Sequence, residues 1–254
     1  MSLIISNWSG RLGNNVLQII RAIHYANINN YNSIEFPKHS AFINNKIIIN
    51  NLNNDKPAIK NSFFYVKELN IIDPEPFIMK KYFKEYINPI FFIKPNQSID
   101  NKNNLFIHIR SGDCFINPHS YYVPPPVYYY IRIIEDKKWD KIFVVYEDDK
   151  NPCVDLLKNK NYTNIEFISG SLNNDLTILS HCQNLAIGFG TFGLLLYFLS
   201  NNIKNLYIPD YAYYEMPKGN WNLNLNIINL PNYIKCGEWK LTNQNLSKVI
   251  NYSI

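Results

Sequence analysis

The second half of the sequence alternates short apolar runs with segments of helical character, and this alternation restricts the chain to few folds. Apolar runs expected to form strands lie at 104–110, 141–146, 165–168, 185–187 and 206–208. Segments with helical patterning separate them, at 127–134, 152–158, 175–183 and 194–200. Alternating strands and helices favour an α/β fold with a parallel sheet. In such open sheets, ligands bind beyond the carboxyl ends of the strands.

The first half of the chain begins with a comparable unit. A short apolar run at 3–5 leads into a glycine-containing loop at 9–14, and apolar residues at helical spacing follow the loop. Further short strands are expected at 33–36 and 46–49, among turns marked by prolines. The sequence does not determine the order of the elements that follow, up to about residue 99.

Both halves start with a strand and a glycine-bearing turn, so we predict a domain boundary near residue 100. The predicted domains are an N-terminal one over 1–100 and a second one over 101–240. A last helix within 241–254 is expected to pack back on the first domain. With 254 residues, of which 46% are hydrophobic, the chain can bury one large core or two small ones.

The charge composition argues against a nucleic-acid partner. A net charge of +5 with only 18% charged residues is a mild basic excess, without dense clusters of Lys and Arg. This balance suits a small anionic ligand better. A domain that binds nucleic acid or a host protein remains an alternative, suggested by the basic excess and the 19 tyrosines.

Cysteine usage and hydropathy suggest where the chain resides. The four cysteines are widely spaced and form no CxxC pair, which is typical of thiols in a reducing compartment. The longest apolar run, at 194–199, is far shorter than the roughly 20 residues that cross a bilayer. No membrane span and no targeting signal are therefore expected, which predicts a cytoplasmic protein, or one of the host cytoplasm if the chain is viral.

The strand expected at 104–110 ends in the run His108-Ile109-Arg110-Ser111-Gly112-Asp113. Strand side chains alternate between the two faces, so His108 and Arg110 point the same way. A guanidinium is a permanent planar cation suited to phosphate oxygens, and Gly112 allows the backbone to approach a ligand closely. The run indicates an anion-binding turn. A structural ion pair between Arg110 and Asp113 is the alternative.

Three other segments place polar residues at strand ends. The loop at 10–15, Gly-Arg-Leu-Gly-Asn-Asn, opens a helix whose N-terminus could attract an anion, although an ordinary tight turn explains it as well. Asp175 lies before the strand at 185–187 and could serve only as a helix cap. The acidic run at 147–149 has no histidine nearby, so we interpret it as a solvated loop and expect no metal site.

These segments together resemble three motifs of one enzyme family. The run at 108–113 resembles the His-x-Arg-Arg-Gly-Asp motif of α-1,2-fucosyltransferases and of the related protein O-fucosyltransferases and α-1,6-fucosyltransferases, with Ser111 where a second arginine is usual. The loop at 10–15 resembles the Gly-Arg-Leu-Gly-Asn-Gln segment near the start of these families. The segment at 175–192 resembles their last motif, an aspartate followed by a strand and a Ser/Thr-Phe-Gly turn.

The resemblance implies a fold and a reaction. The fold would be GT-B-like, with two Rossmann-like domains that have parallel sheets and a cleft between them. The reaction would be an inverting, metal-independent transfer of fucose from GDP-fucose to a hydroxyl of a glycan, with no cofactor besides the nucleotide sugar. Because Ser111 departs from the motif, another nucleotide sugar is an alternative donor, and a non-catalytic module that binds a sugar or nucleotide is another alternative.

The resemblance also implies roles for individual residues. Arg110 would bind the β-phosphate of the donor and stabilise the charge that develops there, and Asp175 would bind guanine through the paired N–H donors that adenine lacks. Asp113 and His119 are candidates for the general base. The implied catalytic residues are Arg110 and Asp113. The implied donor-binding residues are Gly13, Asn14, His108, Arg110, Asp175, Gly190, Thr191 and Phe192.

Overall fold

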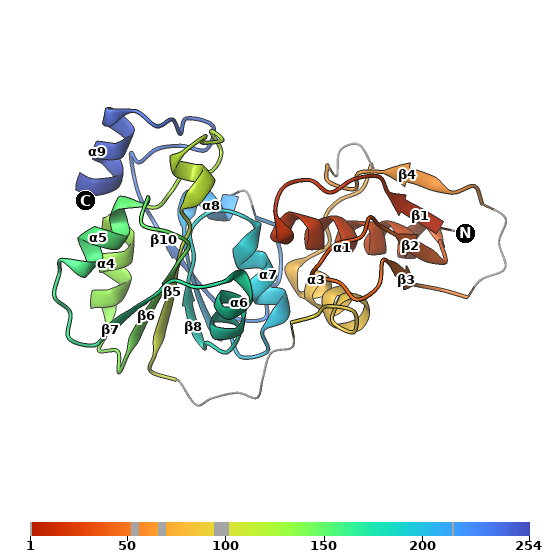
Figure 1. Cartoon of the computed structure of the whole chain (residues 1–254), viewed down its shortest axis with the longest axis horizontal. Coiled ribbons are helices and arrows are strands. Elements are labelled where there is room, and N and C mark those ends of the chain that lie inside the picture. Colours follow the sequence, from red (N-terminus) through yellow and green to blue (C-terminus); the bar gives the residue numbers. More distant parts are fainter. Residues whose placement is uncertain (1, 52–55, 66–69, 94–101, 215) are drawn as a thin grey trace. The chain divides into compact units, whose positions relative to one another are not determined.

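The computed structural model describes the chain except residues 1, 52–55, 66–69, 94–101 and 215 (Figure 1). It divides the chain into two compact units. Unit 1 consists of Met1–Pro95, Thr191–Leu199 and Pro217–Asn222; unit 2 consists of Asn96–Gly190, Ser200–Met216 and Leu223–Ile254. The chain thus changes unit close to residue 100 and then returns twice to unit 1, which a single boundary in the sequence does not anticipate.

Unit 1 contains a small mixed sheet. Its strands are β1 (Ser2–Ile5), β2 (Ser33–Glu35), β3 (Lys46–Ile48) and β4 (Ile59–Asn61), in the order β3-β2-β1-β4. β1 pairs in parallel with β2 and β4, but β3 runs antiparallel to β2. The expectation of a wholly parallel sheet is therefore wrong for β3. A parallel pair needs a crossover of a dozen or more residues, usually through a helix, and the link from β2 to β3 is too short for one.

Three α-helices of unit 1 pack on one another: α1 (Leu12–Asn29), α3 (Pro76–Tyr82) and α7 (Thr191–Leu199). A π-helical turn at Phe83–Ile87 extends α3. The aliphatic residues of α1 expected on its apolar face, such as Val16, Ile20 and Ile23, are all buried. α7 is mostly apolar and buried on nearly all sides, which is why the sequence shows no amphipathic pattern there.

Unit 2 contains a parallel six-stranded sheet, as predicted for an α/β fold. The strands are β5 (Leu105–Ile109), β6 (Ile142–Tyr146), β7 (Ile165–Ile168), β8 (Asn184–Ala186), β9 (Asn205–Pro209) and β10 (Asn224–Ile228). Their order is β10-β9-β8-β5-β6-β7, and every neighbouring pair is parallel. This is the Rossmann order, which reverses direction between the first strand, β5, and the fourth, β8.

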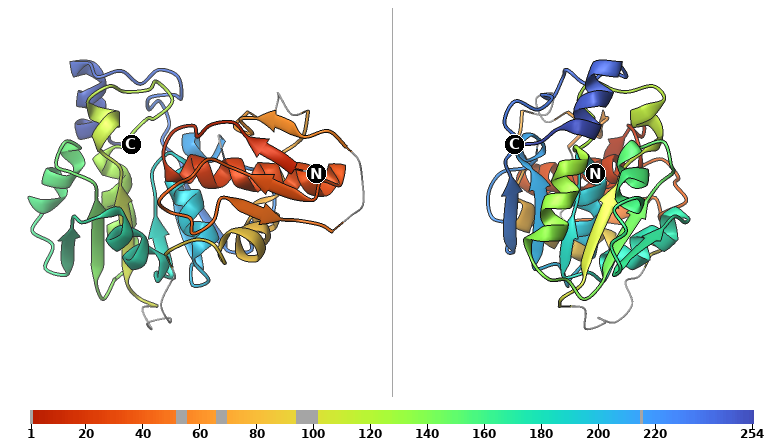
Figure 2. Two further views of the ribbon diagram at one scale, coloured as in Figure 1. Left: turned by 45° about the vertical axis from the view of Figure 1, so that its right-hand side comes forward. Right: turned by 90° about the vertical axis from the view of Figure 1, so that its left-hand side faces the viewer.

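Helices α4 (Val127–Asp136), α5 (Pro152–Lys158), α6 (Leu172–Ser180), α8 (Asp210–Tyr214) and α9 (Asn243–Asn251) complete unit 2. α9 packs on α4 and α5 and lies beside them in Figures 1 and 2. The expectation that the last helix packs on the N-terminal domain is therefore wrong. Val249 is fully buried in the core of unit 2, and the Tyr252 ring contacts Tyr128 and Tyr233. These apolar contacts fix α9 to unit 2.

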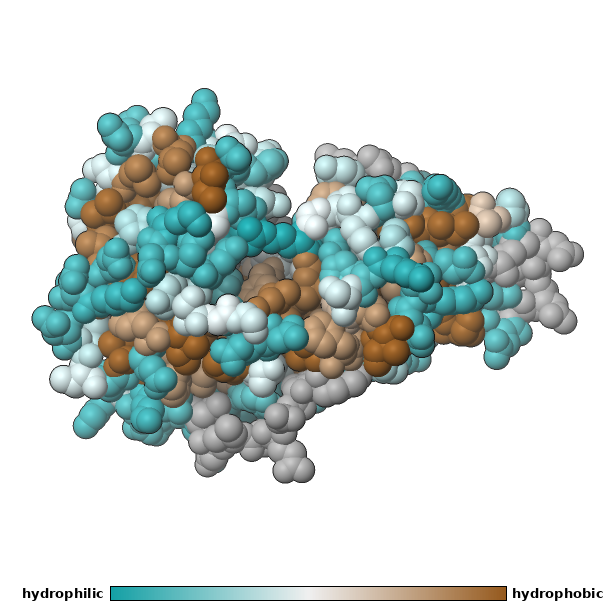
Figure 3. Space-filling model, in the orientation of Figure 1, coloured by the Kyte–Doolittle hydropathy of each residue, from teal (hydrophilic) through white to brown (hydrophobic). Residues whose placement is uncertain are grey.

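The surface has a mixed character. Apolar and hydrophilic residues are interspersed on the face shown in Figure 3.

Over the described ranges, no helix combines the length and the hydropathy that a membrane-spanning helix requires. None of the four cysteines forms a disulfide.

Candidate functional site

The turns after β5 and β8 lie where a Rossmann sheet binds ligands. β5 and β8 pair directly, and the strand order reverses between them, so their carboxyl ends border the crevice that such sheets use. Arg110 follows β5, and Gly190 ends the turn after β8. A Cβ atom added to Gly190 would lie 2.8 Å from Arg110 Nη1, and Gly190 has φ of +110°. Both the positive φ and the guanidinium therefore require glycine at this position.

Arg110 is held on two sides but is not fully bonded. Its Nη2 donates to Oδ1 and Oδ2 of Asp113 at 3.2 and 3.0 Å, and its Cζ lies 4.4 Å from the centre of the Tyr122 ring. The ion pair offered as a structural alternative is thus present. However, Arg110 Nε is buried and has no hydrogen-bond partner among the described residues. A guanidinium has five N–H donors, so this one can still bind an anion while Asp113 holds it.

The loop after β6 fixes the backbone of the same turn. Asp148 accepts a hydrogen bond from the Ser111 hydroxyl and a longer one, 3.5 Å, from Gly112 N. Burial raises the pKa of Asp148, but hydrogen bonds from Lys150 and Ser111 outweigh burial and lower it to about 2, so Asp148 is an anion at neutral pH. Asn151, fully buried, donates from Nδ2 to the Arg110 carbonyl at 2.9 Å.

A tryptophan near the C-terminus braces the turn from another direction. Trp239 is fully buried, and its Nε1 donates to the Cys114 carbonyl at 3.1 Å. Its ring also meets Phe115 edge to face at 5.8 Å between centroids. Cys114 and Phe115 belong to the 3-10 helix Gly112–Phe115 that follows Arg110. Arg110 is therefore anchored by segments far apart in the sequence.

Glu147 lies against the bare backbone of Gly112. A Cβ atom at Gly112 would be 2.6 Å from Oε1 and 3.0 Å from Oε2 of Glu147, and Gly112 has φ of +55°. Glu147 is exposed, as the interpretation of 147–149 as a solvated loop predicts, but Asp148 bonds Ser111 and Lys150, so that interpretation is wrong for Asp148. Both residues lie close to the turn after β5. The sequence does hold a signal for them, because an acidic residue after the neighbouring strand is a feature of Rossmann ligand sites.

Asp175 lies in the first turn of α6 and does not cap it. Ser171 is the N-cap and accepts from Asn174 N at 3.3 Å. Asp175 is 9% exposed, and its Oδ1 is buried without a partner among the described residues. Burial, with a smaller contribution from the charge of Glu147, raises the pKa of Asp175 to about 6. A buried carboxylate oxygen that lacks a hydrogen-bond donor can bind a ligand that carries N–H groups.

His108 is neutral at physiological pH. Burial, with a smaller contribution from the charge of Arg110, lowers the pKa of its imidazole to about 3. A neutral imidazole can donate one hydrogen bond and accept another, but it adds no positive charge for a phosphate. His119, the other histidine considered for catalysis, packs against the Tyr122 ring at 5.1 Å between centroids.

The predicted residues of unit 1 form a separate group. Asn14 Oδ1 accepts from Thr191 Oγ1 at 2.6 Å, and a Cβ atom at Gly13 would be 2.6 Å from the Thr191 carbonyl oxygen. The start of α1 thus packs tightly on the start of α7, where Phe192 follows Thr191. The structure brings together Gly13, Asn14 and Thr191, which belong to motifs far apart in the sequence.

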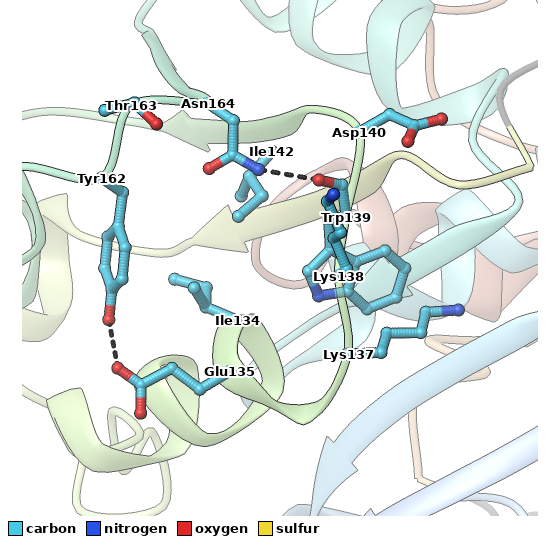
Figure 4. Close-up of a pocket in the computed structure, with 10 residues that line it drawn as sticks. All are labelled: Ile134, Glu135, Lys137, Lys138, Trp139, Asp140, Ile142, Tyr162, Thr163 and Asn164. Atoms are coloured by element: carbon cyan, nitrogen blue, oxygen red, sulfur yellow. Dashed lines mark hydrogen bonds between the residues drawn. The ribbon is translucent and has the colours of Figure 1, made fainter.

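Two pockets in unit 2 differ in character. A small one, about 10 Å³, lies beside Arg110 and Tyr122. A larger one, about 500 Å³, lies where β6 and β7 begin, at the opposite edge of the sheet (Figure 4). In Figure 4 the Tyr162 hydroxyl points to Glu135, and the Asn164 amide points to the Trp139 carbonyl. None of the residues that line the larger pocket has a buried polar side-chain atom without a partner, so its chemistry indicates no ligand.

Within the parts of the chain that the structure describes, no three His, Cys, Asp or Glu side chains are grouped as metal ligands would be. The buried side-chain atoms of unit 2 that lack a partner among the described residues include the Nε–H donor of Arg110, the Oδ1 acceptor of Asp175 and the Tyr130 hydroxyl. Arg110 and Asp175 suit a ligand with a negative charge at one end and N–H donors at the other.

Comparison with known proteins shows the family of the chain. A curated relative, the O-antigen biosynthesis glycosyltransferase WbnK of Escherichia coli, is 28% identical over 168 residues, which cover 56% of this chain and 52% of the relative. The chain thus spans about half the length of that protein. No solved structure matches the chain. The family model described as glycosyl transferase family 11 matches residues 77–221, more than half of the chain and including the turn after β5, Asp175 and Gly190. The resemblance seen in the motifs is thereby confirmed, and the chain belongs to glycosyl transferase family 11.

Proposed function

We propose that this chain is a glycosyltransferase that moves fucose from GDP-fucose to a hydroxyl of a glycan, with inversion and without a metal ion. The observation that carries the proposal is Arg110, a guanidinium at the strand-order reversal with a buried Nε–H that lacks a partner. A diphosphate supplies the missing acceptor. The whole enzyme would have the GT-B architecture that the family resemblance implies.

Asp175 supports guanine as the base. Its buried carboxylate oxygen lacks a donor, and the N1–H and N2–H groups of guanine form a donor pair that one carboxylate can bind. Adenine, cytosine and uracil lack this pair. His108, neutral and partly buried in the same unit, is proposed to contact the guanine end.

In the proposed reaction, the acceptor oxygen attacks the anomeric carbon from the face opposite the diphosphate. The bond between that carbon and the β-phosphate oxygen breaks, and GDP leaves with its electron pair. Arg110 stabilises the charge that develops on the β-phosphate. Asp113 accepts from Arg110 with both oxygens and so orients the guanidinium. The proton of the acceptor hydroxyl passes to a general base, for which His119 and Asp113 are the candidates.

The residues of unit 1 retain the roles that the resemblance gives them. Gly13 and Asn14 at the start of α1, with Thr191 and Phe192 at the start of α7, are proposed to contact the donor. The bond between Asn14 and Thr191 supports a shared role, since it fixes both side chains in one orientation. Gly190, which precedes Thr191, is proposed to contact the diphosphate through its backbone.

A thermal-shift panel tests the proposal. A ligand that binds only the folded state raises the unfolding midpoint. GDP and GDP-fucose are expected to raise it, whereas ADP, CDP and UDP at the same concentration are not. Equal stabilisation by ADP, or none by GDP, would contradict the proposal. Release of GDP from GDP-fucose, slow without an acceptor and faster with glycan acceptors, then separates an enzyme from a non-catalytic nucleotide-binding module.

A further inference from the structure

A nucleoside diphosphate presents three groups in a fixed order: the phosphates, the ribose and the base. Unit 2 offers side chains for the first and the last, Arg110 and Asp175, each with a buried polar atom that lacks a partner among the described residues. The ribose between them carries two neighbouring hydroxyl groups. A site that binds all three parts needs an acceptor for these hydroxyls between the arginine and the aspartate.

Glu147 is the candidate for this acceptor. Both of its carboxylate oxygens are close to Gly112, two residues after Arg110, as the short distances to a Cβ atom there show. Its charge also acts on Asp175, because it contributes to the raised pKa of that carboxyl. Glu147 is therefore close to the turn that carries Arg110, and its charge also reaches the aspartate proposed to bind the base.

The elements around Glu147 support the same position. Glu147 directly follows β6, which pairs with β5, so its side chain leaves the sheet at the carboxyl ends of the strands. In Rossmann folds an acidic residue in this region commonly accepts from ribose hydroxyls. The other two carboxylates of the loop have different roles: Asp148 binds Ser111 and Lys150, and Asp149 pairs with Lys158 at 3.1 Å.

We propose that Glu147 accepts hydrogen bonds from the ribose hydroxyls of the donor nucleotide and so selects ribonucleotides over deoxyribonucleotides. This inference rests on the proposed function, since it assigns a partner within the same donor site. A carboxylate has two acceptor oxygens, which match the two donors of a vicinal diol. A hydrogen bond to a charged group is stronger than one between neutral groups, so its loss is measurable.

The inference is tested by measuring how variants of Glu147 bind GDP and its deoxy analogues. The affinities of GDP, 2′-deoxy-GDP and 3′-deoxy-GDP are measured by calorimetry on the wild type, Glu147→Gln, Glu147→Ala and Asp149→Asn. The wild type is expected to bind GDP about tenfold or more tightly than at least one deoxy analogue. Glu147→Ala should bind all three within about twofold of one another, and Glu147→Gln should fall between. Asp149→Asn, a matched change in the same loop, should keep the wild-type ratio.

The ratio of the affinities for GDP and for a deoxy analogue reports only on the ribose hydroxyl that the analogue lacks. Removing the charge of Glu147 also changes Asp175, but that change alters the affinities of all three nucleotides equally. Glu147 is exposed, so its replacement should leave the unfolding midpoint unchanged. If the wild type does not distinguish the deoxy analogues, or Glu147→Ala keeps the wild-type ratio, the inference is wrong while the proposed function stands. If GDP does not bind the wild type at all, both are wrong.

Discussion

The turns after β1 and β5 have similar backbones, but the polar side chains beside them differ in their hydrogen bonds. Each follows a parallel strand and contains a glycine with positive φ, +69° at Gly10 and +55° at Gly112. After β1, the fully buried Gln18 accepts from Ser9 N, and its Nε2 donates to the carbonyls of Asn7 and Ser62. After β5, the Nε–H of Arg110 remains without a partner among the described residues.

This difference distinguishes a side chain with a structural role, Gln18, from one that can bind a ligand, Arg110. A buried polar group without a partner costs about 1–3 kcal/mol, so it persists where a ligand supplies the partner. Gln18 stabilises its own unit, whereas Arg110 and Asp175 keep hydrogen-bonding capacity for another molecule. A change at Gln18 should therefore act mainly on stability, and a change at Arg110 mainly on binding and turnover.

The largest effect is expected at Arg110. Arg110→Ala should lower kcat/KM for GDP-fucose by about 10²–10³-fold, because it removes the cation that meets the developing charge. The unfolding midpoint should stay near that of the wild type. Arg132→Ala, which removes the same charge from an exposed position on α4, is the control and should retain activity. Near-normal turnover of Arg110→Ala would remove the basis of the proposed function.

Gln18→Ala should produce the largest loss of stability. It leaves three backbone groups without their partner and opens a cavity, which together lower the free energy of unfolding by about 2–4 kcal/mol. Urea denaturation followed by circular dichroism measures this change. Gln244→Ala, the same substitution at an exposed position in the first turn of α9, is the control. A loss below about 0.5 kcal/mol, the range of ordinary surface substitutions, would mean that the two turns do not differ as described.

Asp175→Asn should weaken GDP binding by about tenfold yet stabilise the protein. The folded state holds the proton of Asp175 more tightly than the unfolded state, because its pKa is raised from 3.8 to about 6. The ionised carboxylate therefore destabilises the fold above pH 6, and this effect disappears as the pH falls below the unfolded pKa. We expect a gain of about 1 kcal/mol at pH 7.5, less than the roughly 3 kcal/mol that the shift allows, because water partly screens the group.

The titration of Asp175 predicts that the affinity for GDP depends on pH. GDP affinity of the wild type should fall as the pH is lowered from 7 to 5, since a protonated Asp175 loses one acceptor. The Asp175→Asn variant should show a flatter profile over that range. Calorimetric titrations at several pH values measure both, and parallel profiles for the two proteins would exclude Asp175 as the group that titrates.

The smallest effect is expected at Tyr122. Its ring packs on the guanidinium of Arg110, a contact worth about 0.5–1 kcal/mol where it is partly exposed to water. Tyr122→Leu should lower kcat/KM about two- to fivefold, whereas Tyr122→Phe, which keeps the ring, should retain activity. Equal losses in both variants would assign the effect to the hydroxyl group instead.

The sequence predicts those parts of the fold that depend on local patterning. β6 is a continuous apolar run and β5 is one interrupted only by His108, and both occur where expected. β10 was missed, because asparagines alternate with apolar residues in an edge strand that pairs on one side only. The direction of β3 and the packing of α9 depend on contacts between distant segments, which periodicity does not encode.

In the candidate site, too, the sequence indicates local features but not the contacts between distant segments. The motif at 108–113 points to Arg110 and Asp113, and the structure joins them by an ion pair. The roles of Asp148 and Asn151 follow from the pairing of β5 with β6, which places their loop beside the turn. Strand order is a property of the assembled sheet, so the sequence alone shows an acidic loop after a strand but does not place that loop beside the turn after β5.

The bond from Trp239 to the Cys114 carbonyl has a practical consequence for shortened versions of the protein. A chain cut before residue 239 would keep every motif residue and the whole six-stranded sheet, yet it would lose the indole that fixes the helical turn behind Arg110. Because it also removes α9 and the buried Val249, such a truncation should lower the stability of unit 2 as well as the nucleotide affinity. By contrast, Ile254 is exposed, so an affinity tag appended there should leave that indole undisturbed.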